Sequence, residues 1–218
     1  MKPLTLAILA DRPKPDAAPD AVMPGLQSEY SPAQRRTIGE FMIRATVELA
    51  TSSWPGPVHV YAAPDVDHPL FQTLAEELKV TLRSQGSGDI GARMAAALDE
   101  IVAPGVGGAV ITSDVPHCPW DVLDDANHLL ARGRWVIGPT EANGVWFLGL
   151  PQPQPQIVRS LTHSGRCAFD SVMTQAAQVG IEFDVLDCLR PITTATDLWL
   201  AAQQSEALKD FLDRLKAA

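Results

Sequence analysis

Hydrophobic and polar residues follow two different periods along this chain. Short apolar runs are typical of strands buried on both faces, and they occur at residues 4–10, 58–62, 80–83, 108–112, 135–138, 145–150 and 181–186. Apolar residues spaced three or four positions apart predict helices at residues 32–49, 69–79, 89–101, 119–131, 168–178 and 195–215. Strands and helices therefore alternate along the chain, with one pair of strands following each other directly.

This alternation predicts a three-layer, Rossmann-like α/β fold, in which a mostly parallel sheet carries helices on both faces. The Asn143-Gly144 turn is typical of a hairpin and adds one antiparallel strand. The proline-rich segment 151–155 is too short for a domain linker, so we expect a single domain over residues 1–218. Ligands bind such sheets beyond the carboxyl ends of the strands, which directs attention to the loops at 11–30, 84–89, 113–118 and 138–144.

Charge and composition exclude several classes of function. With 26 acidic against 17 basic residues, the net charge of -9 disfavours nucleic acid as a partner. The apolar run at 4–10 is followed at once by Asp11 and Arg12, so we expect a buried strand rather than a signal peptide, and no run is long enough to span a membrane. The three cysteines form no CxxC pair, which is typical of free thiols in a reducing compartment and predicts a cytoplasmic protein.

A glycine-rich loop precedes the helix expected at 89–101. It consists of Gln85, Gly86, Ser87 and Gly88. Glycines before a helix start let the backbone approach a ligand, and the unpaired amides there favour anions. Arg93 follows Asp89 by one helical turn, so it could hold a phosphate or pair with Asp89 on the surface. On composition alone, a tight turn capped by Asp89 explains the segment better than a phosphate site.

Asp114 directly follows the strand expected at 108–112. A carboxylate at this place could hold Mg²⁺ or Mn²⁺, because these ions prefer one or two carboxylates together with the phosphates of a substrate. An Asx turn before Pro116 and Pro119 explains Asp114 equally well. The residues alone leave both interpretations open.

Three segments in order resemble a known family. Residues 85–94, 112–116 and 138–150 read QGSGDIGARM, TSDVP and GPTEANGVWFLGL. They are similar to the motifs QGGGDLGERM, GSDCP and GPAxDGGYYLIGL of bacterial glycosyltransferase-like proteins of the selenodomain-associated transferase type. Guanylyltransferases of molybdenum-cofactor and phospholactate metabolism are related to that family by fold. One such segment is a weak signal, whereas three in order at matching spacing are specific.

The resemblance implies a GT-A fold that binds a nucleotide or nucleotide-sugar above the sheet, as nucleotidyl- and glycosyltransferases do. It implies that the 85–88 loop, Arg93 and Arg12 face the nucleotide. It further implies that Asp114 holds a weakly bound Mg²⁺ or Mn²⁺, with Glu141 as the nearest second carboxylate.

Several departures from the family pattern put catalysis in doubt. The family places a basic KTRL segment after its first strand, but residues 11–22 of this chain carry carboxylates there, with only Arg12 and Lys14 as bases. The family's Asp-Gly-Gly is Ala-Asn-Gly at 142–144, and its DVDTPEDL is PITTATDL at 191–198, which leaves only Asp197 at a helix start. The alternative is therefore a catalytically silent member that binds a ligand or a protein partner.

Other candidate chemistry is weaker. His117 with Cys118, and His163 with Cys167, lack the spacing of a four-ligand zinc site, and Ser164 lacks the context of a hydrolase nucleophile. Tryptophans at apolar-face positions are more often core than ligand platforms, so we expect core positions for Trp120, Trp135, Trp146 and Trp199.

Overall fold

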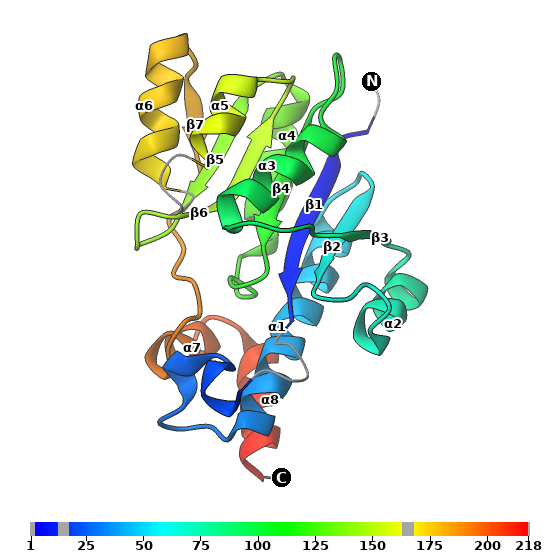
Figure 1. Cartoon of the computed structure of the whole chain (residues 1–218), viewed down its shortest axis with the longest axis vertical. Helices are drawn as coiled ribbons and strands as arrows, with labels where there is room; N and C mark the ends of the chain where they lie inside the picture. Colours follow the sequence, from blue (N-terminus) through cyan, green and yellow to red (C-terminus); the bar gives the residue numbers. More distant parts are fainter. Residues whose placement is uncertain (1–2, 13–17, 163–167, 218) are drawn as a thin grey trace.

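The structure is a computed structural model that describes residues 3–12, 18–162 and 168–217 (Figure 1). These residues form a seven-stranded sheet in the order β3-β2-β1-β4-β6-β5-β7. The strands are β1 (Thr5–Asp11), β2 (Val58–Ala63), β3 (Thr81–Ser84), β4 (Gly108–Thr112), β5 (Trp135–Pro139), β6 (Val145–Leu150) and β7 (Phe183–Val185). Neighbours are parallel except where β6 pairs with β4 and β5, so the expected single antiparallel element is confirmed.

Helices cover both faces of the sheet and one of its ends. They are η1 (Pro19–Ala21), η2 (Pro24–Leu26), α1 (Pro32–Ser53), α2 (Pro69–Leu78), α3 (Ile90–Ile101), α4 (Trp120–Ala131), α5 (Pro155–Ser160), α6 (Phe169–Val179), α7 (Ala195–Ala202) and α8 (Glu206–Ala217). One buried core joins the sheet to α1, α2 and α4, and a second joins its other face to α3, α5 and α6. The predicted three-layer α/β fold is confirmed.

The central strand β1 shows why its residues 6–10 are all apolar. Successive side chains of a strand point to opposite faces of the sheet. Leu6 and Ile8 accordingly enter the core with α1, α2 and α4, whereas Ala7 and Leu9 enter the core with α3, α5 and α6. Because both faces are covered, every one of these positions excludes water and favours an apolar residue.

A third core lies beyond the carboxyl ends of the strands, in the lower part of Figure 1. We call it the terminal helical cluster. It consists of Leu26, Tyr30, Ile38, Met42, Ile192, Ala195, Leu198, Ala201, Ala202, Leu208 and Leu212. Most of these residues come from η2, the first half of α1, α7 and α8, while Tyr30 and Ile192 lie in the segments before α1 and α7. Segments from the first and last fifths of the sequence therefore meet there.

The single helix expected at 195–215 is wrong, because the chain turns between α7 and α8. The turn lies at residues 203–205, where the Ser205 Oγ accepts a hydrogen bond from the Leu208 amide at 3.3 Å. Serine favours such N-terminal positions because its oxygen satisfies an amide that has no partner within the helix. The break directs Leu198 of α7 and Leu208 of α8 into the same cluster.

Two of the tryptophan expectations are also wrong. Trp120 is 66% exposed and Trp199 is 61% exposed, whereas Trp146 is buried and Trp135 is half-buried. Trp120 is the first residue of α4, where a side chain can point past the end of the helix rather than into the sheet.

The sequence does not predict the helix α5, because six residues are too few to show a period.

Side chains cap the first turns of α1 and α3, as the sequence predicts for Asp89. Ser31 caps α1 in a reciprocal capping box with Gln34, and Asp89 caps α3 by accepting the Ala92 amide at 2.8 Å. Asn143 adopts a φ of 59° at the expected turn between β5 and β6. Within the part of the chain that the structure describes, every helix is too short or too polar to cross a membrane.

Candidate functional site

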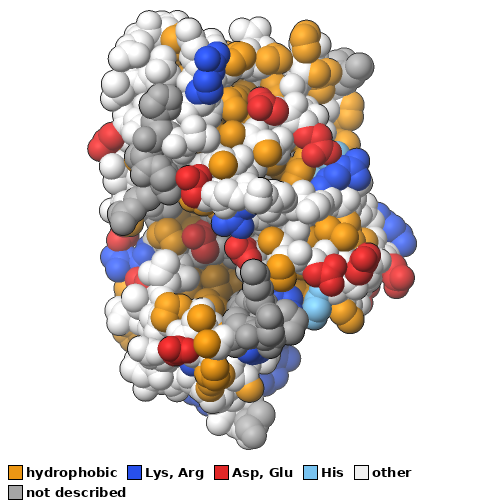
Figure 2. Space-filling view, in the orientation of Figure 1, with side chains coloured by type: hydrophobic (Ala, Val, Ile, Leu, Met, Phe, Trp, Pro, Cys, Tyr) orange, Lys and Arg blue, Asp and Glu red, His pale blue; other side chains and the backbone are white. Residues whose placement is uncertain are grey.

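A cleft lies between the carboxyl edge of the sheet and the terminal helical cluster. It consists of two cavities of about 250 and 490 Å³ that share Ile90, Thr112 and Asp114. The smaller is also lined by Leu9, Asp11, Met23, Gly39, Met42, Ile43, Arg93, Ser113 and Ile192, and the larger by Thr140, Ala142, Asn143, Gly144, Val145, Ala168, Pro191 and Thr193. Figure 2 shows acidic and basic side chains on both sides of a hollow at this level.

Asp114 occupies the centre of the cleft, at the junction of the two cavities. Its Oδ1 accepts a hydrogen bond from the Thr112 hydroxyl at 2.5 Å, and its carbonyl oxygen accepts the Ile192 amide at 2.8 Å. Burial raises the pKa of Asp114, and the hydrogen bond from Thr112 offsets only part of this rise. An ionised carboxylate here is therefore costly unless a cation or a further donor approaches it.

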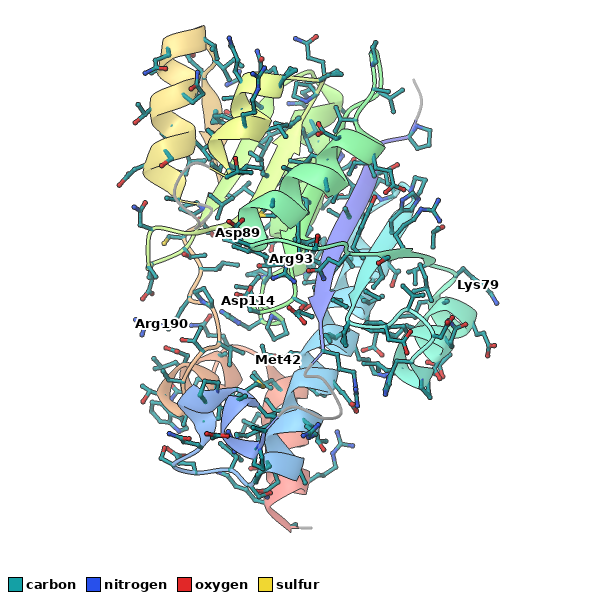
Figure 3. All side chains as sticks on the ribbon, viewed as in Figure 1. Met42, Lys79, Asp89, Arg93, Asp114 and Arg190 are labelled. Atoms are coloured by element: carbon teal, nitrogen blue, oxygen red, sulfur yellow. The ribbon has the colours of Figure 1, made fainter. Side chains whose placement is uncertain are left out.

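Arg93 also lines the smaller cavity, and Figure 3 shows it on the ribbon near Asp114. Two groups hold its side chain. Its Nη1 donates to Asp11 Oδ2 at 2.8 Å and to Gln85 Oε1 at 2.5 Å. Gln85 is buried, and its Nε2 donates to the carbonyl oxygen of Tyr61 at 2.9 Å. Gln85 thus positions Arg93, and Arg93 pairs with Asp11 rather than with Asp89.

The glycine-rich loop lies beside the cleft rather than in its lining. Gly86, Ser87 and Gly88 are exposed, and both glycines have positive φ, 75° and 110°. Glycine is the residue that adopts this conformation without strain, which explains both positions. Within the segment 85–94, Ile90 and Arg93 line the cavities. Contact between the backbone amides of 86–88 and a ligand stays a prediction.

Arg12 lines neither of the two cavities. Its Nε lies 2.7 Å from Glu40 Oε1 on α1, and its side chain is only 11% exposed. The pair ties the end of β1 to α1. Lys14 and Asp16, the other charged residues considered in this loop, lie outside the described residues, as do His163, Ser164 and Cys167.

Glu141 lines a different cavity from Asp114. This cavity, of about 280 Å³, also contains His117 and Arg190, and Arg190 Nη2 lies 2.5 Å from Glu141 Oε2. Residues 189–192 form hydrogen bonds to both residues. The carbonyl oxygen of Leu189 accepts a hydrogen bond from the Glu141 amide, and the Ile192 amide donates to the carbonyl oxygen of Asp114. The structure therefore does not bring the two predicted metal ligands into one cavity.

The carboxylates that line the cleft with Asp114 are few. Among the residues that the structure describes, Asp11 is the other one, and it is already paired with Arg93. Among residues 3–12, 18–162 and 168–217, no three His, Cys, Asp or Glu side chains are grouped as metal ligands. Oxygen donors of this kind suit Mg²⁺ or Mn²⁺, so the residues fit such an ion only if a ligand's phosphates supply most of its coordination. Sequence analysis had treated Asp11 as part of a loop, although its place at a strand end was the available signal.

Asn143 and Asp197 lie in the two segments where the family carries further carboxylates, and both have clear structural roles. Asn143 Nδ2 donates to Asp170 Oδ2 at 3.0 Å, and Asn143 Oδ1 accepts the Asp170 amide at 3.2 Å. An aspartate at 143 would face the carboxylate of Asp170. Asp197 forms a capping box with Thr194 at the start of α7, where Thr193 also donates to it.

Comparison with known proteins identifies the family. Residues 46–165, more than half of the chain, match the family described as "Uncharacterized protein conserved in bacteria (DUF2064)". The chain belongs to the DUF2064 family. No protein with a curated description matches the DUF2064 chain.

Solved structures share the fold of the DUF2064 chain at low sequence identity. A candidate nucleotide-diphospho-sugar transferase from Desulfovibrio desulfuricans G20 superimposes with a TM-score of 0.77 at 17% identity, covering 99% of this chain and 97% of that one. A 4-diphosphocytidyl-2C-methyl-D-erythritol synthase from Anaerococcus prevotii DSM 20548 gives a TM-score of 0.59 at 11% identity, covering 93% and 97%. A cytidylyltransferase from Leptospira borgpetersenii gives 0.55 at 12%, covering 100% and 95%. The DUF2064 chain therefore has a GT-A-like, nucleotide-sugar-transferase-like fold.

Proposed function

We propose that this protein binds a nucleotide or nucleotide-sugar in the cleft at the carboxyl edge of the sheet, in the manner of a nucleotidyl- or glycosyltransferase. The observation that carries the proposal is that Arg93 and Asp114 line one cavity at this edge. A guanidinium binds phosphate through charge-assisted hydrogen bonds, and a carboxylate can share a divalent cation with that phosphate. The fold is also that of proteins named as nucleotidyl- and nucleotide-sugar transferases.

In this proposal Arg93 contacts the phosphates, and the exposed amides at 86–88 supply further donors. Gln85 holds Arg93 in place. Asp114 would hold Mg²⁺ or Mn²⁺, which would offset charge on a leaving diphosphate, and Glu141 would join it only by leaving Arg190. One structural neighbour, Rv0371c from Mycobacterium tuberculosis H37Rv, is described in complex with manganese, at 13% identity and a TM-score of 0.50.

We further propose that residues 1–218 work as one cytoplasmic domain. The first half of α1 and the segment from residue 191 both line the cleft, so the two ends of the sequence contribute to the same site. Cys118 and Cys188 are both free thiols, which suits a reducing compartment.

A second candidate is a catalytically silent member that keeps the binding cleft. It is favoured by the pairing of carboxylates. Asp11 is bonded to Arg93 and Glu141 to Arg190, so the described residues offer Asp114 no second unpaired acid in its cavity. A silent protein would hold its ligand mainly through Arg93 and the loop amides, with little help from a metal.

Thermal unfolding with a panel of nucleotides and nucleotide-sugars, with and without Mg²⁺ or Mn²⁺, tests both candidates. We expect one class of nucleotide at a hundred times its Kd to raise Tm by roughly 5–10 °C, with only a slight further gain from metal. A large gain on adding metal that is lost in Asp114→Asn would instead establish the metal-dependent transferase.

Asp99→Asn is a matched control for this experiment. Asp99 is exposed on α3 and outside both cavities, so the variant changes net charge by the same amount without touching the cleft. Absence of stabilisation by every nucleotide, with or without metal, would contradict the proposed function. Calorimetry with Mn²⁺ alone should show only weak binding, since ligand phosphates are needed to complete the ion's coordination.

A further inference from the structure

The contact between Arg93 and Asp11 places a carboxylate of the protein where a ligand phosphate would bind. The same Nη1 atom of Arg93 donates to Asp11 Oδ2 at 2.8 Å and to Gln85 Oε1 at 2.5 Å. Gln85 is neutral, so it orients the guanidinium without cancelling its charge. Asp11 is anionic, so it occupies the position that an anionic ligand needs.

The two partners of Arg93 differ in how firmly they are held. Gln85 is 3% exposed and is bonded to the Tyr61 carbonyl, so its side chain cannot leave without losing a buried hydrogen bond. Asp11 is the last residue of β1, and its side chain is 60% exposed. An ion pair with so exposed a member contributes little to stability, which makes Asp11 the partner that a ligand can displace.

Arg93 also has hydrogen-bonding capacity that the protein does not use. Its Nε is buried, and none of the described residues accepts a hydrogen bond from it. The side chain is 18% exposed and faces the smaller cavity, in which Asp11 is the carboxylate bonded to it. The guanidinium is thus fixed in place at the wall of the cavity, and the contact that an anion must replace is the one to Asp11.

We propose that Asp11 is the residue that determines which anions Arg93 accepts, by competing with them for its guanidinium. The inference rests on the proposed function, because it takes a phosphate as the incoming group. A displaced Asp11 carboxylate stays at the rim of the same cavity and repels the anion that displaced it. Inorganic phosphate and pyrophosphate are therefore disfavoured, and the site selects ligands whose phosphates are accompanied by further binding groups, as in a nucleotide.

Calorimetric titration with inorganic pyrophosphate in a metal-free buffer containing a chelator tests this competition. We expect Asp11→Asn to bind pyrophosphate about tenfold more tightly than the wild type, a change that corresponds to about 1.4 kcal/mol. Asp99→Asn, which alters net charge equally, should leave the affinity unchanged. Exposure of Asp11 on the strand end predicts that the variant folds normally, and its melting curve checks this.

A double substitution shows whether the gain acts through Arg93. Arg93→Ala in the Asp11→Asn background should remove the tenfold gain, because the group for which Asp11 competes is then absent. Equal affinity of Asp11→Asn and Asp99→Asn, or no measurable pyrophosphate binding by any variant, would overturn the inference.

The nucleotide panel separates this inference from the proposed function. If Asp11→Asn gains affinity for pyrophosphate while no nucleotide stabilises the wild type, the competition is real and the proposed ligand class is wrong. If nucleotides stabilise the wild type and Asp11→Asn gains nothing, the proposed function holds and the role given to Asp11 is wrong.

Discussion

At the scale of single residues, the buried carboxylate of Asp114 in the cleft destabilises the folded protein. Asp114 lies among Leu9, Ile43 and Met42 in the smaller cavity, with the Thr112 hydroxyl as its donor. Burial of an ionised carboxylate among apolar groups is costly, which is the cause of the raised pKa of Asp114. Such residues are common at binding sites, where the missing stabilisation is supplied by a ligand.

This cost predicts that Asp114→Asn stabilises the protein without ligand at pH 7. We expect a rise in Tm of about 2–4 °C, the shift that 1 kcal/mol produces in a domain of this size. Because the pKa of Asp114 is raised, the native state favours the protonated carboxyl, so the penalty is full above the folded pKa and fades as the pH falls toward the unfolded value of 3.8. Melting curves from pH 7 downward should therefore show the two proteins converging. A lower Tm for Asp114→Asn at pH 7 would contradict this account.

At the scale of elements, short polar segments decide where helices start. Asp197 Oδ2 accepts hydrogen bonds from the amides and hydroxyls of Thr193 and Thr194 at 2.8–3.2 Å. Burial alone would raise the pKa of Asp197, but these hydrogen bonds outweigh it and lower the pKa. Asp197 is the carboxylate that this chain keeps of the family's DVDTPEDL segment. It fixes the start of α7 and the backbone of residues 193–194, of which Thr193 lines the larger cavity.

Removal of this cap should destabilise the protein in a pH-dependent way. Asp197→Ala is expected to cost about 0.5–2 kcal/mol at pH 7, as losses of helix caps do. The lowered pKa means that the contribution is complete above the unfolded value of 3.8 and is lost as the pH falls through the folded pKa. Thr196→Ala, an exposed change in the same turn, is the control and should cost little. Chemical unfolding at pH 7 measures both variants, and equal stabilities would contradict the capping role.

At the scale of the whole molecule, the cleft exists because the terminal helical cluster docks against the sheet edge. A close backbone approach beside the cleft joins η2 to the segment before α7. A Cβ added to Gly25 would lie 2.1 Å from the Thr193 carbonyl oxygen and 3.3 Å from the Thr194 Cα. Glycine is required there because two backbones pass within contact distance, and this contact holds Thr193 in the wall of the larger cavity.

Gly25→Ala should therefore disturb both stability and binding. The added methyl group must move one backbone away from the other, and overpacking of this kind costs about 1–3 kcal/mol. We expect a lower Tm together with a smaller nucleotide-induced shift, because the wall of the cleft moves with Thr193. If Gly25→Ala melted at the wild-type temperature, the close packing of η2 against Thr193 would be contradicted. If its nucleotide-induced shift in Tm equalled that of the wild type, this packing would not influence the binding site.

The sequence by itself determined the layers of this fold. Apolar runs such as 4–10 and 108–112 could be recognised as strands because burial on both faces leaves no polar position, and the caps Ser31 and Asp89 act on amides only a few residues away. The three motifs that resemble the family also indicated that the cleft lies at the carboxyl edge of the sheet. Residues that follow parallel strands meet at that edge whatever the details of packing.

Only the tertiary structure decided which charged groups meet. Asp11 pairs with Arg93 across 82 residues, and Glu141 pairs with Arg190 from a separate cavity; neither contact leaves a periodic signal. The break between α7 and α8 and the exposure of Trp120 likewise depend on what each helix packs against. Periodicity reports the burial of a face, whereas the pairing of two side chains depends on positions that long-range packing alone sets.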